Sequence, residues 1–198
     1  GVRLLVSDPD TDDVRHAAAR DLPKFLGPGD VLVVNASATI NAALDGWRSE
    51  RSSAGELVVL HLSSPVPWSD DDHRWVIELR RLTGDGTHPL LDARAGERVR
   101  LRGGGSATLL APFGERTSGL PNGVVRLWEA ELTCPGGVMA YAEEFGAPIR
   151  YAYVRERRPL YMYQTMFSME PGSAEMPSAG RPFTADIVMR LQSKGVVV

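Results

Sequence analysis

The middle of the chain, from residue 57 to residue 132, alternates short apolar runs with turn residues, and this pattern limits the possible folds more than any other feature. The five runs cover residues 57–62, 75–81, 97–102, 107–110 and 124–132. The segments between them are rich in Gly, Pro, Ser and Asp, which is typical of hairpin connections. Short strands joined in this way favour a small antiparallel barrel or sandwich.

The two ends of the chain have a different pattern. Residues 31–34 read Val-Leu-Val-Val after a Gly-Pro-Gly-Asp turn, and this run without alternation predicts a strand buried on both faces of a sheet. Thr184 is placed to cap a helix that carries apolar residues on one face and stops at Gly195. Residues 196–198 begin a further apolar strand, so we expect the last part to end prematurely.

Charge is distributed unevenly over a chain whose net charge is −3. The segment 146–198 has more basic than acidic residues, and its densest basic cluster is Arg150, Arg155, Arg157 and Arg158. We expect this cluster to meet an anionic partner such as RNA, with Tyr151 and Tyr153 placed to stack on a base. The alternative is a strand with one face in the core and a solvated end.

Several classes of protein are excluded or disfavoured. At 198 residues the chain is shorter than a complete eight-stranded β/α barrel, which needs about 250. A single cysteine and four scattered histidines predict neither a disulfide within the chain nor a metal site. No long apolar run or leader-like segment occurs, so we expect a cytoplasmic protein without membrane association, as a monomer or a weak dimer.

Ordered blocks near both ends resemble one known family. The first covers residues 22–44, with Leu-Pro-Lys-Phe-Leu-Gly-Pro-Gly-Asp-Val-Leu-Val-Val-Asn at its start. The second contains Tyr-Gln-Thr at 163–165, Pro-Gly at 171–172 and Pro-Ser-Ala-Gly-Arg-Pro-Phe-Thr at 177–184. Their order and spacing resemble the S-adenosylmethionine:tRNA ribosyltransferase-isomerase family of queuosine biosynthesis.

The resemblance implies a fold class that is mixed α/β and β, in which an α/β barrel-like domain is interrupted by an inserted small antiparallel β-barrel. We expect residues 1–48 to be the first part of the α/β domain, 49–145 the insert and 146–198 the return. The family transfers the ribosyl part of S-adenosylmethionine, its co-substrate, to 7-aminomethyl-7-deazaguanine in tRNA. The ribosyl group is rearranged to epoxyqueuosine, and adenine and methionine are released.

The matching blocks also suggest which residues bind the substrates, although no catalytic residue is assigned. The expected binding residues are Asn35, Gln164, Thr165, Ser178, Ala179, Gly180 and Phe183, and the expected RNA-binding residues are Arg150, Arg155, Arg157 and Arg158. Small residues before the capped helix allow a ligand to approach backbone N–H groups. Each group has an alternative role. Asn35 could simply form a turn, Gln164 and Thr165 could be satisfied polar groups in the core, and Ser178, Ala179 and Gly180 could form a plain loop.

The chain departs from the family pattern at several positions of these blocks. Ala36, Ala38 and Ala43 stand where the family has an acid or amide and two arginines, and Pro182 replaces a histidine, a possible proton carrier. We therefore expect this chain alone to be inactive or nearly so. Two alternatives are open: a nucleoside- or RNA-binding domain without turnover, and an enzyme acting on a different nucleoside.

Overall fold

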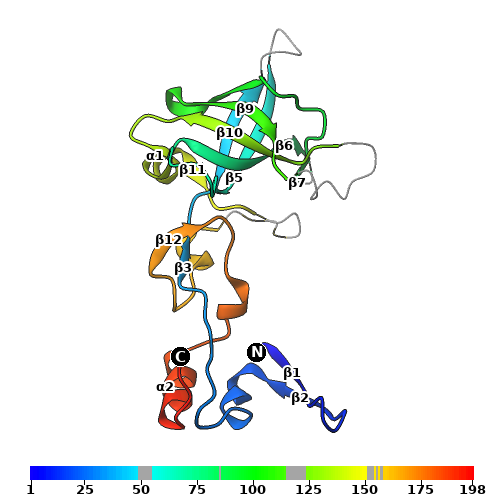
Figure 1. Ribbon diagram of the computed structural model, residues 1–198, viewed down its shortest axis with the longest axis vertical. Coiled ribbons are helices and arrows are strands. Elements are labelled where there is room, and N and C mark those ends of the chain that lie inside the picture. The colour runs from blue at the N-terminus through cyan, green and yellow to red at the C-terminus, as the bar shows by residue number, and fades with distance from the viewer. Residues whose placement is uncertain (49–54, 85, 115–123, 151–153, 155, 157) are drawn as a thin grey trace. The chain divides into compact units, whose positions relative to one another are not determined.

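The computed structural model describes residues 1–48, 55–84, 86–114, 124–150, 154, 156 and 158–198 (Figure 1). The chain divides into two compact units. The barrel unit consists of Thr39–Tyr163 and Gly172–Glu175, and the terminal unit consists of Gly1–Ala38, Gln164–Pro171 and Met176–Val198. In the described residues, no helix has the length and apolar character needed to span a membrane.

The barrel unit is built on antiparallel strands that close on themselves (Figure 1). They are β4 (Ala43–Arg48), β5 (Glu56–Pro65), β6 (Arg74–Thr83), β8 (Arg98–Leu101), β9 (Ser106–Pro112) and β10 (Leu127–Thr133). The order is β4-β5-β6-β10-β9-β8, and the pairing of β8 with β4 completes the ring. Closure pairs the edges that an open sheet would expose.

Shorter elements complete the barrel unit. Strand β7 (Gly86–Pro89) pairs with the end of β6, and β11 (Gly146–Ala147) pairs with the start of β4. Helix α1 (Val138–Phe145) leads into β11, and the 3-10 turns η2 (Arg102–Gly104) and η3 (Leu160–Tyr163) lie in connections. Strands β3 (Ser37–Thr39) and β12 (Glu170–Ser173) form a separate two-stranded sheet that is not confined to the barrel unit.

The antiparallel barrel expected from the sequence is confirmed, and each of the five apolar runs overlaps one of its strands. One barrel strand, β4, falls instead within the part that the sequence pattern assigns to the first α/β segment. Its buried positions are Leu44, Gly46 and Arg48, so two of three inward residues are not apolar and the alternation is hidden. Gly46 is required there, because a Cβ on it would lie 2.7 Å from Val99 Cγ1.

The main boundaries of the barrel unit lie at 38/39 and 163/164, whereas the sequence pattern predicts boundaries at 48/49 and 145/146. The difference arises because β4 and β11 pair with each other inside the barrel sheet. Independent folding of residues 49–145 stays a prediction.

The terminal unit contains a hairpin, a 3-10 turn and a helix: β1 (Arg3–Ser7), β2 (Val14–Ala18), η1 (Ala19–Lys24) and α2 (Ala185–Ser193). Its apolar cluster is centred on Ile187, Leu191 and Val196. The predicted helix is confirmed, since the Thr184 hydroxyl accepts from the Ile187 N–H at 3.4 Å. Gly195 follows with φ of 82°, a backbone conformation that favours glycine.

Residues 31–34 do not form the doubly buried strand expected from their composition. Leu32 packs on the apolar cluster, but Val31 and Val33 are 68% and 89% exposed. The single recorded pairing of the described residues in this run is a parallel bridge between Val31 and Val197. The expectation was wrong because only alternate side chains of the run meet a neighbour. The described residues do not confirm the α/β barrel-like part, which stays a prediction.

Candidate substrate-binding site

The second family block folds back on itself within the terminal unit. Gly180 lies in the 3-10 turn η4 (Ser178–Gly180), and a Cβ placed on it would be 3.2 Å from Thr165 Cγ2. The rings of Phe167 and Phe183 meet edge to face with centroids 5.5 Å apart. Two parts of the block that are well separated in sequence are therefore neighbours in space.

Thr165 organises the turn that carries it. Its N–H donates to Ser168 Oγ at 2.9 Å, and its hydroxyl accepts from the Phe167 N–H at 3.2 Å. These local bonds hold the half-buried Gln164 and Phe167 on either side of it. The Thr165 hydroxyl is therefore already hydrogen-bonded within its own turn, as the alternative of a satisfied polar residue expects. Direct contact between Thr165 and a ligand stays a prediction.

The η4 turn presents small residues at the surface. Ser178 and Ala179 are exposed, and Gly180 is half-buried. The Gly180 N–H already donates to the Pro177 carbonyl at 2.9 Å, so it is engaged within the turn. Pro182, at the position where the family has a histidine, lies half-buried directly after this turn and has no N–H to donate.

Asn35 belongs to the same unit, and the next residue, Ala36, is hydrogen-bonded to the second block. Its side-chain oxygen accepts from the Ser37 N–H at 2.8 Å, which is an Asx turn. The carbonyl of Ala36 accepts from the N–H groups of Met169 and Glu170, at 2.9 and 3.2 Å. The structure therefore brings the end of the first block against the loop after Phe167.

The expected RNA-binding residues are only partly described. Arg155 and Arg157, with Tyr151 and Tyr153, lie outside the described residues. Arg150 and Arg158 both line a cavity of about 580 Å³ in the barrel unit. Arg158 also forms an exposed ion pair with Glu156 at 2.8 Å.

The same cavity contains His61, which the sequence analysis did not select. Burial is the main cause that lowers the pKa of His61 to about 4, and the positive charge of Arg80 adds to it. The imidazole is therefore neutral near pH 7. The available signal was a histidine inside the apolar run Leu-Val-Val-Leu-His-Leu at 57–62.

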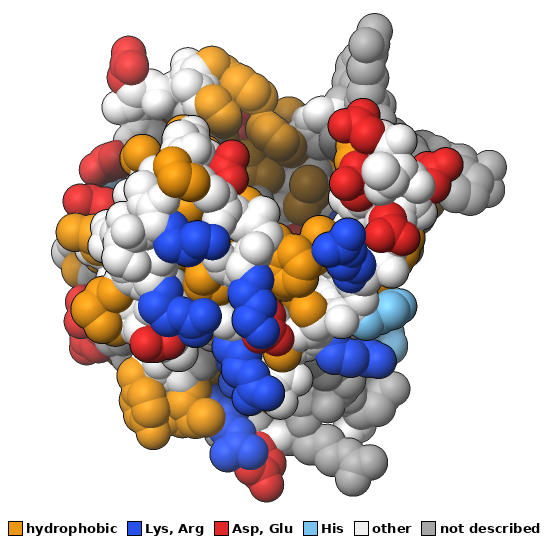
Figure 2. All heavy atoms as spheres, turned by 90° about the horizontal axis from the view of Figure 1, so that it is seen from below, with side chains coloured by type: hydrophobic (Ala, Val, Ile, Leu, Met, Phe, Trp, Pro, Cys, Tyr) orange, Lys and Arg blue, Asp and Glu red, His pale blue; other side chains and the backbone are white. Residues whose placement is uncertain are grey.

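A second basic surface was also missed, because its residues come from both ends of the chain. Arg20 and Lys24 lie on η1, and Arg190 and Lys194 lie on or beside α2, all of them exposed. Lys194 Nζ donates to the carbonyls of Pro23 and Leu26, so α2 is held against η1. Figure 2 shows Lys and Arg side chains gathered on one face of the molecule.

Potential metal ligands converge at one place among the described residues. Asp71, Asp72 and His73 can bring their ligand atoms within 4.8 Å of one another, but all three are exposed. Exposed acidic groups of this kind are common without a bound ion, and we assign no metal site to them.

Comparison with known proteins identifies the family. Residues 1–198 match the model of the queuosine biosynthesis protein family, and the chain belongs to that family. It is 34% identical over 186 residues to S-adenosylmethionine:tRNA ribosyltransferase-isomerase of Thermus thermophilus, covering 92% of this chain and 47% of that protein. The enzyme of the same name from Heliobacterium modesticaldum is 31% identical over 199 residues, covering 99% of this chain and 51% of the relative.

The chain spans about half the length of the curated relatives that it matches. Among solved structures, the crystal structure of S-adenosylmethionine tRNA ribosyltransferase from Thermotoga maritima is 17% identical. That comparison covers 99% of this chain and 48% of the other, with a TM-score of 0.40.

Proposed function

We propose that this protein acts in the transfer and isomerisation of the ribosyl group of S-adenosylmethionine onto 7-aminomethyl-7-deazaguanine in tRNA, giving epoxyqueuosine. The observation that carries the proposal is the family match over residues 1–198. Relatives with that enzyme name align over nearly the whole of this chain. Because the chain covers only about half of each relative, the reaction, the co-substrate and tRNA are all parts of the proposal.

In this proposal, the terminal unit provides part of the substrate-binding site. The proposed binding residues are Asn35, Gln164, Thr165, Ser178, Ala179, Gly180 and Phe183. Their support is that all seven belong to the terminal unit and that Gly180 approaches Thr165 closely, since a Cβ on Gly180 would lie 3.2 Å from Thr165 Cγ2. The finer α/β barrel-like architecture of this part is likewise a proposal from the family resemblance.

The chemistry sets what such a site must do. The exocyclic amine of the deazaguanine base attacks the ribosyl group, and the positive charge of the sulfonium is lost as methionine leaves. The site must hold both reactants in line and bind the base in single-stranded RNA. We assign binding and orientation to the residues above, and no proton transfer to any of them.

The second candidate function is binding of a nucleoside or RNA without turnover. The observation that favours it is the replacement of charged or amide positions of the family pattern by Ala36, Ala38 and Ala43, and of a histidine by Pro182. Residues that act jointly in catalysis are not compensated by those that remain. Binding therefore survives such losses more readily than catalysis.

The test is incubation of the chain with S-adenosylmethionine and tRNA that bears the deazaguanine precursor, with adenine release measured by chromatography. Equilibrium dialysis with labelled S-adenosylmethionine measures binding separately. Adenine release supports the proposed reaction, and binding of both substrates without release supports the second candidate. If neither S-adenosylmethionine nor tRNA binds, both candidate functions are overturned.

A matched glycine pair tests where S-adenosylmethionine binds. Gly180→Ala pushes a methyl group against Thr165, and we expect weaker binding of S-adenosylmethionine. Gly172→Ala is the control, because a Cβ at Gly172 meets nothing within 4 Å. Equal binding by the two variants contradicts the assignment of the η4 turn to the site.

A further inference from the structure

The cavity of the barrel unit lies on the outer side of the barrel wall. Side chains alternate along a strand, and Val58, Leu60 and Leu62 of β5 belong to the core. The intervening Val59 and His61 therefore point away from the core, and both line the cavity. Its volume of about 580 Å³ is in the range of sites for small organic ligands.

His61 is a buried polar residue in the lining of this cavity. It is only 9% exposed, and the described residues record no hydrogen bond or ion pair for its side chain. A neutral imidazole offers one donor and one acceptor to a ligand that enters the cavity. The two ring nitrogens point in diverging directions, so a single polar edge of a ligand bonds one of them, as donor or as acceptor.

Two aromatic rings at the wall are held in place by their own contacts. Phe145 packs against Tyr141 with ring centroids 4.8 Å apart. The Tyr163 carbonyl accepts from the Thr39 hydroxyl at 3.0 Å, which fixes the backbone that carries the Tyr163 ring. Flat aromatic side chains of this kind are the usual partners of unpaired bases.

Charged side chains of both signs line the cavity, with Asp45 and Glu144 beside three arginines. Arg150 and Arg158 lie at its wall, and Arg102 also contributes. The ion pair of Arg158 with Glu156 is exposed, so it contributes little and leaves the guanidinium able to exchange partners. Guanidinium groups bind phosphate through paired N–H donors.

We propose that this cavity binds one nucleotide unit, with its base beside His61, Phe145 and Tyr163 and its phosphate toward Arg150 and Arg158. The nucleotide is either an unpaired residue of RNA or a free nucleoside monophosphate, which present the same chemistry. This proposal rests on the proposed function in one respect, which is that the RNA supplying the nucleotide is tRNA. One ring nitrogen of the neutral imidazole can hydrogen-bond the edge of a nucleobase.

The test measures binding of two probes to the 198-residue chain: single-stranded hexaribonucleotides, and the four free nucleoside monophosphates. We expect His61→Phe, which keeps a ring and removes both nitrogens, to lower affinity about tenfold, the effect of one or two lost hydrogen bonds. His73→Phe is the matched control, because His73 is exposed and is not part of the cavity lining. The proton resonances of the His61 ring should shift on titration with the bound probe.

Two further variants keep the test decisive if His61→Phe fails to fold. Ala43→Leu fills the cavity beside His61 and should abolish binding, since Ala43 lies opposite His61 in the β4–β5 register. Arg158→Gln should weaken binding and reduce its dependence on salt, whereas Arg100→Gln, an exposed arginine outside the lining, should do neither.

Binding of the hexaribonucleotide alone identifies RNA as the source, and binding of the monophosphates identifies free nucleotide. The proposal is overturned if neither probe saturates the protein, or if Ala43→Leu and Arg158→Gln both bind as the parent chain does. S-adenosylmethionine binding, measured separately, distinguishes failure of this site from failure of the proposed function.

Discussion

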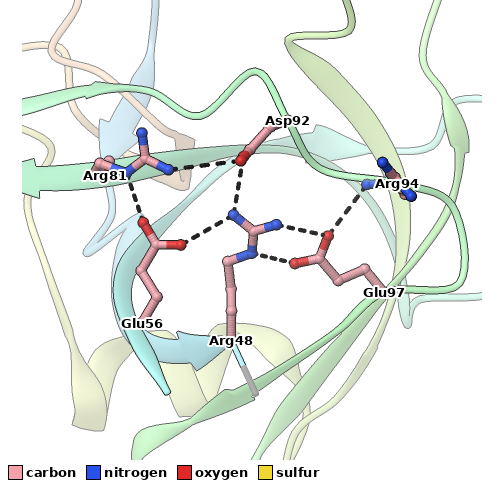
Figure 3. A network of polar contacts seen from close by, with 6 residues as sticks. All are labelled: Arg48, Glu56, Arg81, Asp92, Arg94 and Glu97. Atoms are coloured by element: carbon pink, nitrogen blue, oxygen red, sulfur yellow. Dashed lines mark hydrogen bonds and ion pairs between the residues drawn. The ribbon is translucent and has the colours of Figure 1, made fainter. Parts of the chain in front are cut away.

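The Arg48 guanidinium donates to both carboxylate oxygens of Glu97 (Figure 3). The two side chains are only 2% and 4% exposed. Arg48 Nη1 also donates to Glu56 at 3.2 Å and to Asp92 at 3.0 Å. Burial acts to lower the pKa of Arg48, but the hydrogen bonds to Glu97 and Asp92 outweigh it and raise the pKa. Arg48 stays charged inside the barrel unit because its donors are paired.

Replacing one partner of this pair should destabilise the protein strongly. Glu97→Gln leaves the buried Arg48 charge without its main counter-charge, and such changes cost about 3 kcal/mol or more. Urea unfolding followed by Trp fluorescence measures the loss. Glu131→Gln, on the exposed side of β10, is the matched control and should change stability by less than about 0.5 kcal/mol. A loss below about 1 kcal/mol for Glu97→Gln contradicts the structural role of the pair.

A methyl group at Gly46 should disturb the closure of the barrel. The added Cβ would lie 2.7 Å from Val99 Cγ1 and 3.0 Å from the Arg100 carbonyl, so β4 and β8 must move apart. We expect Gly46→Ala to cost about 1 to 3 kcal/mol, the usual penalty for overpacking. Thermal unfolding compared with Gly84→Ala, where a Cβ meets nothing within 4 Å, isolates the effect. Equal melting temperatures for the two variants would show that β4 does not pack closely on β8.

Stability should decrease as the pH falls from about 6.5 toward 4. Burial and Arg80 lower the pKa of His61 to about 4, with Arg126 adding and Glu78 opposing. The unfolded chain therefore binds a proton on this histidine before the folded protein does, and protonation favours unfolding. Below the folded-state pKa of His61 this loss of stability is complete, and it amounts to about 3 kcal/mol.

Urea unfolding at several pH values, for the parent chain and His61→Phe, measures how much protonation of His61 changes the free energy of unfolding. Carboxylates titrate in both proteins, so the difference between the two curves isolates the histidine. The difference should change between about pH 6.5 and 4 and level off outside that window. A difference that does not vary with pH contradicts a neutral, buried His61.

The thiol of Cys134 should be inert in the folded protein. Burial raises the pKa of Cys134 to about 11, and the thiolate is the reactive form. We expect negligible reaction with a disulfide reagent at about pH 8 over the time in which an unfolded sample reacts completely. Absorbance of the released aromatic thiol measures both rates. Fast labelling of the native chain contradicts the buried position of this side chain.

The local sequence was sufficient for elements whose signal lies within a few neighbouring residues. Alternating short runs and turn residues predicted strands β5, β6, β8, β9 and β10, because side-chain period and turn chemistry are local properties. Thr184 and Gly195 predicted the ends of α2 for the same reason. The ordered family blocks predicted the family, which the comparison over residues 1–198 confirmed.

Only the tertiary structure decided which residues share a surface. Closure of the barrel joins β6 to β10 and β4 to β8, strands far apart in sequence, and this closure makes Gly46 and Arg48 inward positions. The register of β5 on β4 places His61 opposite Ala43, and Arg150 and Arg158, far along the chain, line the same cavity. No local pattern contains this information. Whether a charge can be buried, and which side chains line a cavity, depends on partners that only long-range strand pairing supplies.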